Sequence, residues 1–249
     1  MKKLLFLILV GLLPASCSSS PAPTQPALIE SPAPTATLQT PPQPIPATET
    51  FTPIPTFTST PYPMYFTEEF DADLAAWDFF QTGGVNLPTA RLENSLLRID
   101  IASPHTWYYA IHAAHDYSNV TVSAKVDGSP AGSLGLVCFY NEEEGWYEFN
   151  IASDGTYNAL FGQWLAEGIA QYIPLAGDPA STLAPGGLNY EISLTCQKDA
   201  LFVSINGNTI RRVDVARYGL VAGKIGIAAA SFEQIPMSAV FDWVRVSEK

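Results

Sequence analysis

The feature that most constrains the fold is the stretch from Leu134 to Asn158, LGLVCFYNEEEGWYEFNIASDGTYN. Its apolar side chains recur at every second position, which is the period of β-strands and not of helices. Two polar breaks divide it. The first, Asn141 to Gly145, is charged and ends in glycine, as exposed turns often do. The second, Ser153-Asp154-Gly155, indicates a hairpin, because an Asp-Gly pair accepts the positive φ of tight turns. The stretch therefore predicts three consecutive antiparallel strands.

The middle strand of this stretch has two different faces. One face carries Tyr147, Phe149 and Ile151. The other face carries Trp146, Glu148 and Asn150. Alternation of this kind is typical of an antiparallel strand with one face on the core and one face in solvent. We therefore expect the first row to be buried and the second row to be exposed.

Downstream of Tyr65 the chain keeps the strand period and shows no sustained helical period. Further strands or hairpins are predicted within residues 66–71, 90–100, 120–126, 160–175, 190–205, 224–229 and 239–246. Trp77 is expected in a loop, as are Trp164 and residues 177–188. Strands at this spacing predict an all-β antiparallel sandwich, and residues 65–249 are enough for one large domain of that type.

The first residues have the layout of an export signal. Met1-Lys2-Lys3 is positively charged, and the apolar run from Leu4 to Leu13 is too short to span a bilayer. The small residues before Cys17 resemble the signal of a bacterial lipoprotein, in which the cysteine is lipidated and becomes the new N-terminus. Pro14 stands where that motif has leucine, so ordinary secretion with cleavage near Ala15 remains the alternative.

A change of composition follows this signal. Residues 18–64 are rich in Pro, Thr, Ser and Ala, and the only charges among them are Glu30 and Glu49. Such a segment has almost nothing to bury, so we expect a disordered linker between a signal peptide at 1–17 and a domain at 65–249. At about 3 Å per residue it would reach on the order of 100 Å. The exported domain would then stand on the cell surface or face the periplasm.

The charge of the chain restricts its partners. The sequence has 24 acidic residues against 12 basic ones, and two of the bases, Lys2 and Lys3, lie in the signal. So acidic a surface repels nucleic-acid backbones and anionic lipid headgroups. We therefore expect no nucleic-acid partner, and membrane attachment only through the lipid on Cys17.

Two further cysteines, Cys138 and Cys196, each lie in an apolar strand row. An even pair in an exported chain favours a disulfide. The alternative is two buried free thiols.

Six short segments carry a family resemblance. They are LVCFY at 136–140, YEFNIASDG at 147–155, ISLTC at 192–196, VSING at 203–207, GI at 226–227 and FDWV at 241–244. Together they resemble the concanavalin A-like lectin and glucanase superfamily, and most closely its laminin-G-like and 3-keto-disaccharide-hydrolase-like domains. The resemblance covers nearly all of residues 65–249. It implies a jelly roll of two curved antiparallel sheets with a ligand on the concave face or rim loops. It does not determine function, because lectins, hydrolases and adhesion modules share the fold.

The polar face of the middle strand is the candidate ligand site. Trp146 would stack on the apolar face of a sugar ring, while Glu148 and Asn150 would bind its hydroxyls. The residues that could extend this platform are Tyr157, Trp164 and Trp107. The alternative is that Trp146 packs beneath a neighbouring loop.

A catalytic alternative rests on Glu144 and Glu148. Laminarinase-type glycoside hydrolases have their two catalytic acids four residues apart, as Glu-x-Asp-x-Glu, but Trp146 replaces the middle acid here. The two Cα atoms would be about 13 Å apart, whereas a retaining pair needs carboxyl groups separated by about 5 Å. The acidic turn at 142–144 is typical of a solvated turn, and bound Ca²⁺ is its alternative. We therefore predict no catalytic residues and no cofactor.

The three histidines do not predict a metal site. If residues 109–117 form a strand, His112 and His115, which are three apart, should face opposite sides and could not share a metal. These two and His105 are interpreted as structural or surface residues.

The sequence leaves three functions open. The first is a tethered, non-catalytic carbohydrate-binding or adhesion module whose partner is a glycan or cell-surface polysaccharide. The second is a glycoside hydrolase of the same fold. The third is a structural envelope lipoprotein without a small ligand.

Overall fold

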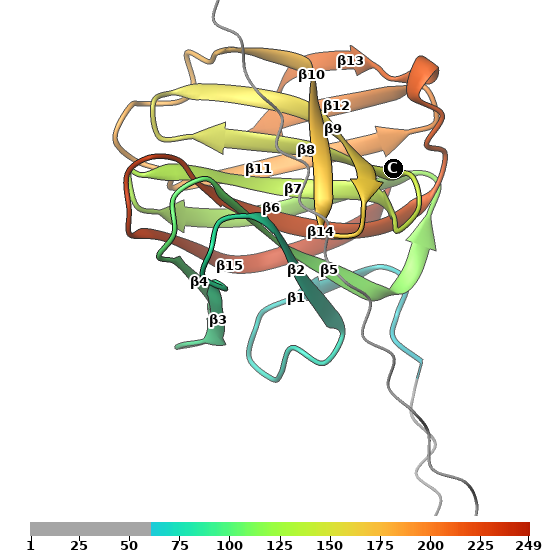
Figure 1. The fold of residues 1–249 in the computed structure, drawn as a ribbon. Coiled ribbons are helices and arrows are strands. Elements are labelled where there is room, and N and C mark those ends of the chain that lie inside the picture. Colours follow the sequence, from blue (N-terminus) through green and yellow to red (C-terminus); the bar gives the residue numbers. More distant parts are fainter. Residues whose placement is uncertain (1–60) are drawn as a thin grey trace, which may run out of the picture. The chain divides into compact units, whose positions relative to one another are not determined.

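A computed structural model describes residues 61–249. The predicted signal peptide, Cys17 and the predicted linker up to residue 60 lie outside the described residues. The described chain forms two antiparallel sheets packed face to face, with one short 3₁₀ helix, Ala216–Tyr218 (Figure 1). No helix in this part of the chain is long and apolar enough to cross a membrane. The prediction of an all-β antiparallel jelly-roll sandwich is confirmed.

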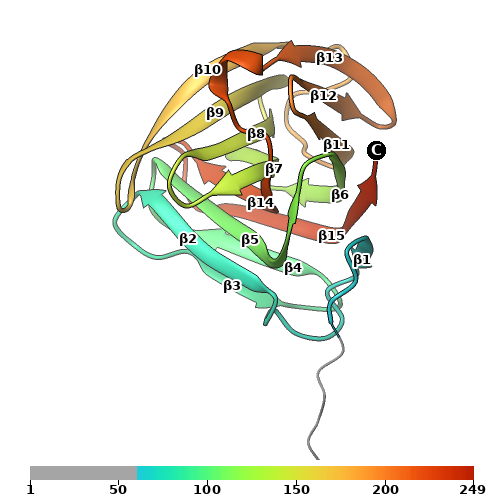
Figure 2. The ribbon, with the colours of Figure 1, turned by 90° about the vertical axis from the view of Figure 1, so that its right-hand side faces the viewer.

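Each sheet interleaves strands that are distant in sequence (Figure 2). The eight-stranded sheet contains, in spatial order, β13 (Asn208–Asp214), β12 (Ala200–Ile205), β11 (Tyr190–Gln197), β6 (Val120–Gly128), β15 (Met237–Glu248), β4 (Leu97–Ile101) and β3 (Thr89–Leu92), and β1 (Phe66–Glu68) pairs with β15. The seven-stranded sheet contains β10 (Ile169–Pro179), β9 (Thr156–Ala166), β8 (Gly145–Ala152), β7 (Gly132–Asn141), β14 (Gly223–Ser231), β5 (Thr106–Tyr117) and β2 (Trp77–Gly83).

The core lies between the two sheets. The predicted apolar row of β8, namely Tyr147, Phe149 and Ile151, is buried in it. Cys138 of β7 and Cys196 of β11 form the predicted disulfide, with their Cα atoms 6.5 Å apart. Because β7 and β11 belong to different sheets, this bond joins the two layers through the core.

Two expected loops are strands, and a third, at 177–188, begins three residues later than expected. Trp77 begins β2 and packs in the core, with its ring centroid 6.0 Å from that of Phe70. Trp164 lies inside β9, which forms a hairpin with β10 through a turn at Gly168, where φ is +70°. β10 continues to Pro179, into the expected loop. It is an edge strand with a register shift after Pro174, and edge strands with bulges are where proline is tolerated.

The chain makes tertiary contacts from Tyr62 onward. The Tyr62 ring packs edge-on against Phe66, and its hydroxyl donates to a carboxylate oxygen of Glu68 at 3.1 Å. The hydroxyl of Tyr117 donates to the carbonyl oxygen of Met64 at 2.7 Å. The segment that enters the domain is therefore fastened to β5 before β1 begins.

The expectation that His112 and His115 face opposite sides is wrong. The His112 ring lies 4.5 Å from the Tyr62 ring, and His115 Nε2 lies 2.7 Å from the Tyr62 carbonyl oxygen. The register of β5 against β14 shifts between Gly223 and Ile225, and a bulge of this kind interrupts the alternation of side chains. Both histidines consequently contact Tyr62, in the segment that precedes β1.

The burial of His112 predicts a dependence of stability on pH. Its side chain is fully buried among Tyr62, Phe66 and Trp77, and neither ring nitrogen has a hydrogen-bond partner within residues 61–249. Burial, assisted by the nearby His115, lowers the pKa of His112 to about 4. The unfolded chain, with a pKa of about 6.5, takes up a proton first as the pH falls. Stability should therefore be full above pH 6.5 and decline between pH 6.5 and 4.

The full decline should be up to about 3 kcal/mol, because one pKa unit is worth about 1.4 kcal/mol. Urea unfolding at pH 7 and pH 4.5 measures it. His112→Phe should reduce the difference in the free energy of unfolding between the two pH values. His105→Asn, at an exposed histidine, should leave that difference unchanged. An equal pH dependence in wild type and His112→Phe would contradict this account.

Candidate functional site

The seven-stranded sheet curls until its two edge strands meet. The Tyr172 hydroxyl of β10 is hydrogen-bonded to the Thr82 hydroxyl of β2, although β10 and β2 are at opposite ends of the sheet. The Tyr172 ring also stacks on Trp107 of β5, with centroids 5.2 Å apart. In Figure 1, β10 accordingly stands across the strands behind it. The face of this sheet that points away from the core is therefore concave, and contacts between its edges partly close it.

Aromatic side chains fill this concave face and form a cluster separate from the core. We call it the concave cluster, and its aromatic members are Phe80, Trp107, Tyr109, Tyr140, Trp146, Trp164 and Tyr172. Trp146 is central, with ring centroids 5.0 Å from Trp164 and 5.1 Å from Tyr109. Gly162 of β9 lies opposite Trp146, and a Cβ at this position would overlap the indole ring. Glycine here allows the indole to lie against the β9 backbone.

The row Trp146, Glu148 and Asn150 shares the concave face, as its spacing predicts, but it is not exposed. These side chains are 0%, 1% and 4% exposed, respectively. The expectation of an open platform on this strand is therefore wrong. Strand alternation shows which residues share a face, whereas the cover over this face comes from β2, β5 and β10.

Glu148 lies beneath this cover and is held by three donors. Its Oε2 accepts hydrogen bonds from the Tyr109 hydroxyl and from Trp146 Nε1, both at 2.9 Å. Its Oε1 accepts one from Asn150 Nδ2 at 2.7 Å. Burial raises the pKa of Glu148, while the hydrogen bonds from Trp146, Asn150 and Tyr109 oppose that rise. The carboxyl group therefore belongs to a satisfied internal network that orients the surrounding rings.

The other predicted platform residues divide between the two faces of the sheet. Trp107 and Trp164 join the concave cluster and are half-buried. Tyr157 lies on the opposite face, in the core beside Phe149, so it does not extend the platform. Sequence reasoning missed Phe80, Tyr140 and Tyr172. Correct bounds for β2 and β10 would have indicated two of them, because Phe80 and Tyr172 follow from the alternation in those strands.

The structure does not bring Glu144 and Glu148 together as a catalytic pair. Glu144 is exposed in the turn between β7 and β8, whereas Glu148 is buried. The three groups that are hydrogen-bonded to the Glu148 carboxylate are all donors, and none of them is a carboxyl group. A retaining glycosidase needs a second carboxyl group about 5 Å from the first.

The acidic turn is ordered by Asn141. Its Oδ1 accepts the backbone N–H groups of Glu143 and Glu144 at 2.8 and 3.1 Å. Within residues 61–249, no three His, Cys, Asp or Glu side chains are grouped so that they could hold a metal ion.

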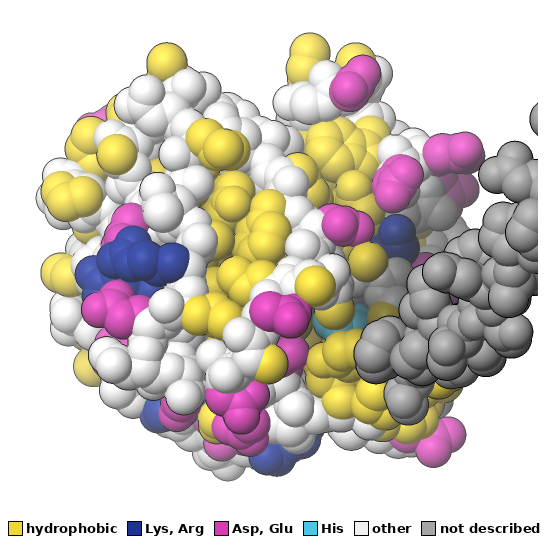
Figure 3. Space-filling model, turned by 90° about the horizontal axis from the view of Figure 1, so that it is seen from below, with side chains coloured by type: hydrophobic (Ala, Val, Ile, Leu, Met, Phe, Trp, Pro, Cys, Tyr) yellow, Lys and Arg dark blue, Asp and Glu magenta, His cyan; other side chains and the backbone are white. Residues whose placement is uncertain are grey.

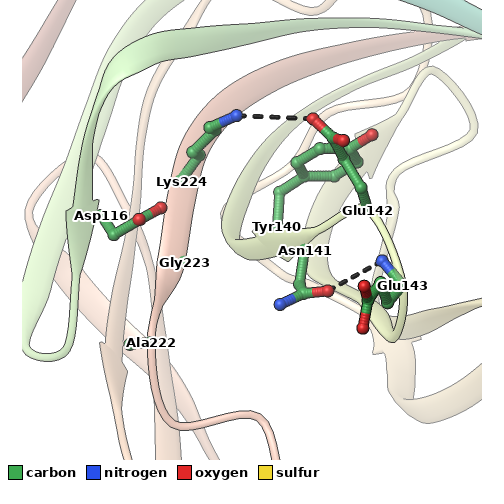
Figure 4. Close-up of a pocket in the computed structure, with 8 residues that line it drawn as sticks. All are labelled: Asp116, Tyr140, Asn141, Glu142, Glu143, Ala222, Gly223 and Lys224. Atoms are coloured by element: carbon green, nitrogen blue, oxygen red, sulfur yellow. Dashed lines mark hydrogen bonds and ion pairs between the residues drawn. The ribbon is translucent and has the colours of Figure 1, made fainter.

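Two pockets flank this turn, and Tyr140 lines both. The Lys224 pocket, of about 480 Å³, is lined by Asp116, Tyr140, Asn141, Glu142, Glu143 and Lys224 (Figure 4). There Lys224 Nζ reaches across to the Glu142 carboxylate at 3.5 Å. The Trp164 pocket, of about 460 Å³, is lined by Tyr140, Glu142, Glu143, Trp164, Leu165 and Glu167. The concave cluster therefore reaches the surface through Tyr140 and Trp164.

A second apolar area is exposed outside these pockets. Val85 and Leu87, in the loop between β2 and β3, are 90% and 74% exposed. Figure 3 shows one face of the molecule as a whole. Across this face, hydrophobic side chains gather in a band with acidic side chains beside it.

Known structures share this architecture. An endo-acting O-glycanase of human gut microbiota has a TM-score of 0.53 and 9% identity, over 74% of this chain and 98% of that one. The mixed-linkage glucan GH16 protein of Bacteroides ovatus, solved with its G4G4G3G product, has a TM-score of 0.52 and 9% identity, over 73% and 99%. The carbohydrate recognition domain of Emp46p has a TM-score of 0.52 and 10% identity, over 74% and 95%.

These likenesses agree with a β-sandwich of two antiparallel sheets. At such low identity they show the fold alone. No protein-family model matches the chain, and no curated protein sequence matches it.

Proposed function

We propose that the domain is a non-catalytic carbohydrate-binding module of an exported protein. The observation that carries this proposal is the opening of the concave cluster into a pocket at Tyr140 and Trp164. Half-buried aromatic rings beside polar groups suit a sugar, because a ring stacks on the apolar face of a pyranose while polar groups bind its hydroxyls. The printed functions of the structural neighbours, which act on or recognise glycans, support the same class of ligand.

The state of Glu148 supports binding rather than cleavage. A general acid must reach the glycosidic oxygen, but this carboxylate is buried under aromatic rings and engaged by three donors. Its neighbours on the same strand face, Trp146 and Asn150, are not acids.

Export is part of the proposal. A disulfide between the two sheets forms and persists in an oxidising compartment. We propose that a lipid on Cys17 and the proline-rich segment behind it present the domain to extracellular polysaccharide.

Removal of Trp164 tests the binding site. On a glycan array, the full chain should bind one class of glycan, and Trp164→Ala should lose roughly tenfold in affinity. An aromatic contact is worth about 0.5–1.5 kcal/mol beyond its area, and 1.4 kcal/mol is a factor of ten. Trp164→Phe should restore part of the loss.

Trp243→Ala is the matched control, because this half-buried tryptophan lies on β15 of the other sheet. Thermal melts of all variants identify any loss that is due to unfolding.

The array is repeated with calcium and with chelator, and each bound glycan is assayed for new reducing ends. Release of reducing ends would favour a hydrolase, and the absence of any bound glycan would favour a structural lipoprotein.

A further inference from the structure

We infer that the glycan bound in the Trp164 pocket carries protonated amines, as a glucosamine polymer does. This inference rests on the proposed function and adds the chemical class of the ligand. It follows from the combination, in one pocket, of aromatic walls, an apolar rim and uncompensated negative charge.

The aromatic walls come first. Tyr140 and Trp164 both line the pocket and both belong to the concave cluster, which restricts the orientations of their rings. Trp164 packs against Trp146 at 5.0 Å and Phe80 at 5.4 Å between centroids. Ring faces held in this way can stack on a pyranose and also attract a cation within about 6 Å of the centroid. A sugar ring that bears an ammonium group can use both interactions.

The rim is apolar at its outer end. Leu165 and Ile169, at the turn between β9 and β10, are 61% and 58% exposed. Leu165 lines the pocket, and Ile169 directly follows its lining residue Gly168. Side chains of this type cover the apolar face of a sugar and do not compete for its hydroxyls. The pocket volume of about 460 Å³ lies in the usual range of small-ligand sites.

The charge of the pocket then selects among sugars. Glu142, Glu143 and Glu167 line it, and no lysine or arginine does. Glu142 lines both pockets, and Lys224, which lines only the neighbouring pocket, partly balances its charge at 3.5 Å (Figure 4). Glu143 and Glu167 form no ion pair within the described part of the chain. Their field repels uronic acids and sulfated sugars and attracts an ammonium group, and the net charge of the whole chain, −12, acts in the same direction.

Two oligosaccharides of equal length test the inference. Calorimetric titrations of the full chain at pH 6 compare a glucosamine hexamer with an N-acetylglucosamine hexamer, which has no amine charge. We expect the glucosamine hexamer to bind at least tenfold more tightly, with the advantage decreasing as salt is raised. Raising the pH until the amines are neutral should abolish the advantage.

Variants separate charge from stacking. Glu143→Gln with Glu167→Gln should bring the affinity ratio of the two hexamers close to one. Glu191→Gln with Glu233→Gln is the matched control, because both residues are exposed on other loops and strands. Trp164→Ala should weaken both hexamers.

The outcomes distinguish the two proposals. Equal affinities for the hexamers in the wild type would overturn the amine inference and leave the carbohydrate-binding proposal standing. Binding of a lysine-rich peptide but of neither hexamer would overturn the amine inference and indicate a protein ligand for this pocket. A glycan array with no bound glycan would overturn both.

Discussion

Replacing Trp146 with alanine should lower the free energy of unfolding by about 3–5 kcal/mol, the usual cost of truncating a buried tryptophan. The side chain is completely buried at the centre of the concave cluster, so its removal leaves a cavity bordered by Tyr109, Trp164 and Phe80. It also removes one of the three donors to the buried Glu148 carboxylate. Equilibrium unfolding in urea, monitored by far-ultraviolet circular dichroism, measures the loss.

Two variants identify the cause of this loss. Trp146→Phe keeps most of the ring volume but removes the Nε1 donor, so its stability should lie between wild type and Trp146→Ala. Trp243→Ala truncates a half-buried tryptophan on the other sheet and should cost less than Trp146→Ala. A loss below about 1.5 kcal/mol for Trp146→Ala would mean that the concave cluster is not a packed second core.

Removing the disulfide should cost about 4 kcal/mol by the chain-entropy estimate for a loop of this length. Cys138 and Cys196 are 58 residues apart in sequence and fully buried, and their bond joins the two sheets. The double variant Cys138→Ala with Cys196→Ala should therefore unfold at a markedly lower urea concentration.

Wild type unfolded in the presence of reductant is the control for the double variant. It should show a similar loss, because reduction releases the same loop without truncating the side chains. If reduction leaves the unfolding midpoint unchanged, the disulfide does not contribute the stability expected here.

The local sequence pattern was sufficient to predict the fold. The alternation in β8 correctly placed Tyr147, Phe149 and Ile151 in the core, and the turns at 141–145 and 153–155 lie between the strands as predicted. The pairing of Cys138 with Cys196 followed from their apolar rows and the expected export. These predictions depend on side-chain period and turn chemistry, which neighbouring residues determine.

The candidate site depended on contacts that no local pattern contains. Trp146 and Glu148 were correctly placed on one face, but the hydrogen bond that closes this face joins residues 90 positions apart, Thr82 and Tyr172. Sequence spacing could not show that a curled sheet would cover its own concave side. The bulge in β5 had a similar effect, because one irregular position brought His112 and His115 to the same neighbour.

The pairing of β1 with β15 determines how the domain responds to pulling. Only three residue pairs, from Phe66–Val246 to Glu68–Val244, join the first strand to the last one. Tension applied through the preceding segment would reach Tyr62 and then these pairs before the disulfide-linked layers. If the domain is tethered as proposed, tension on it should therefore detach β1 before it disturbs the layers that the disulfide joins.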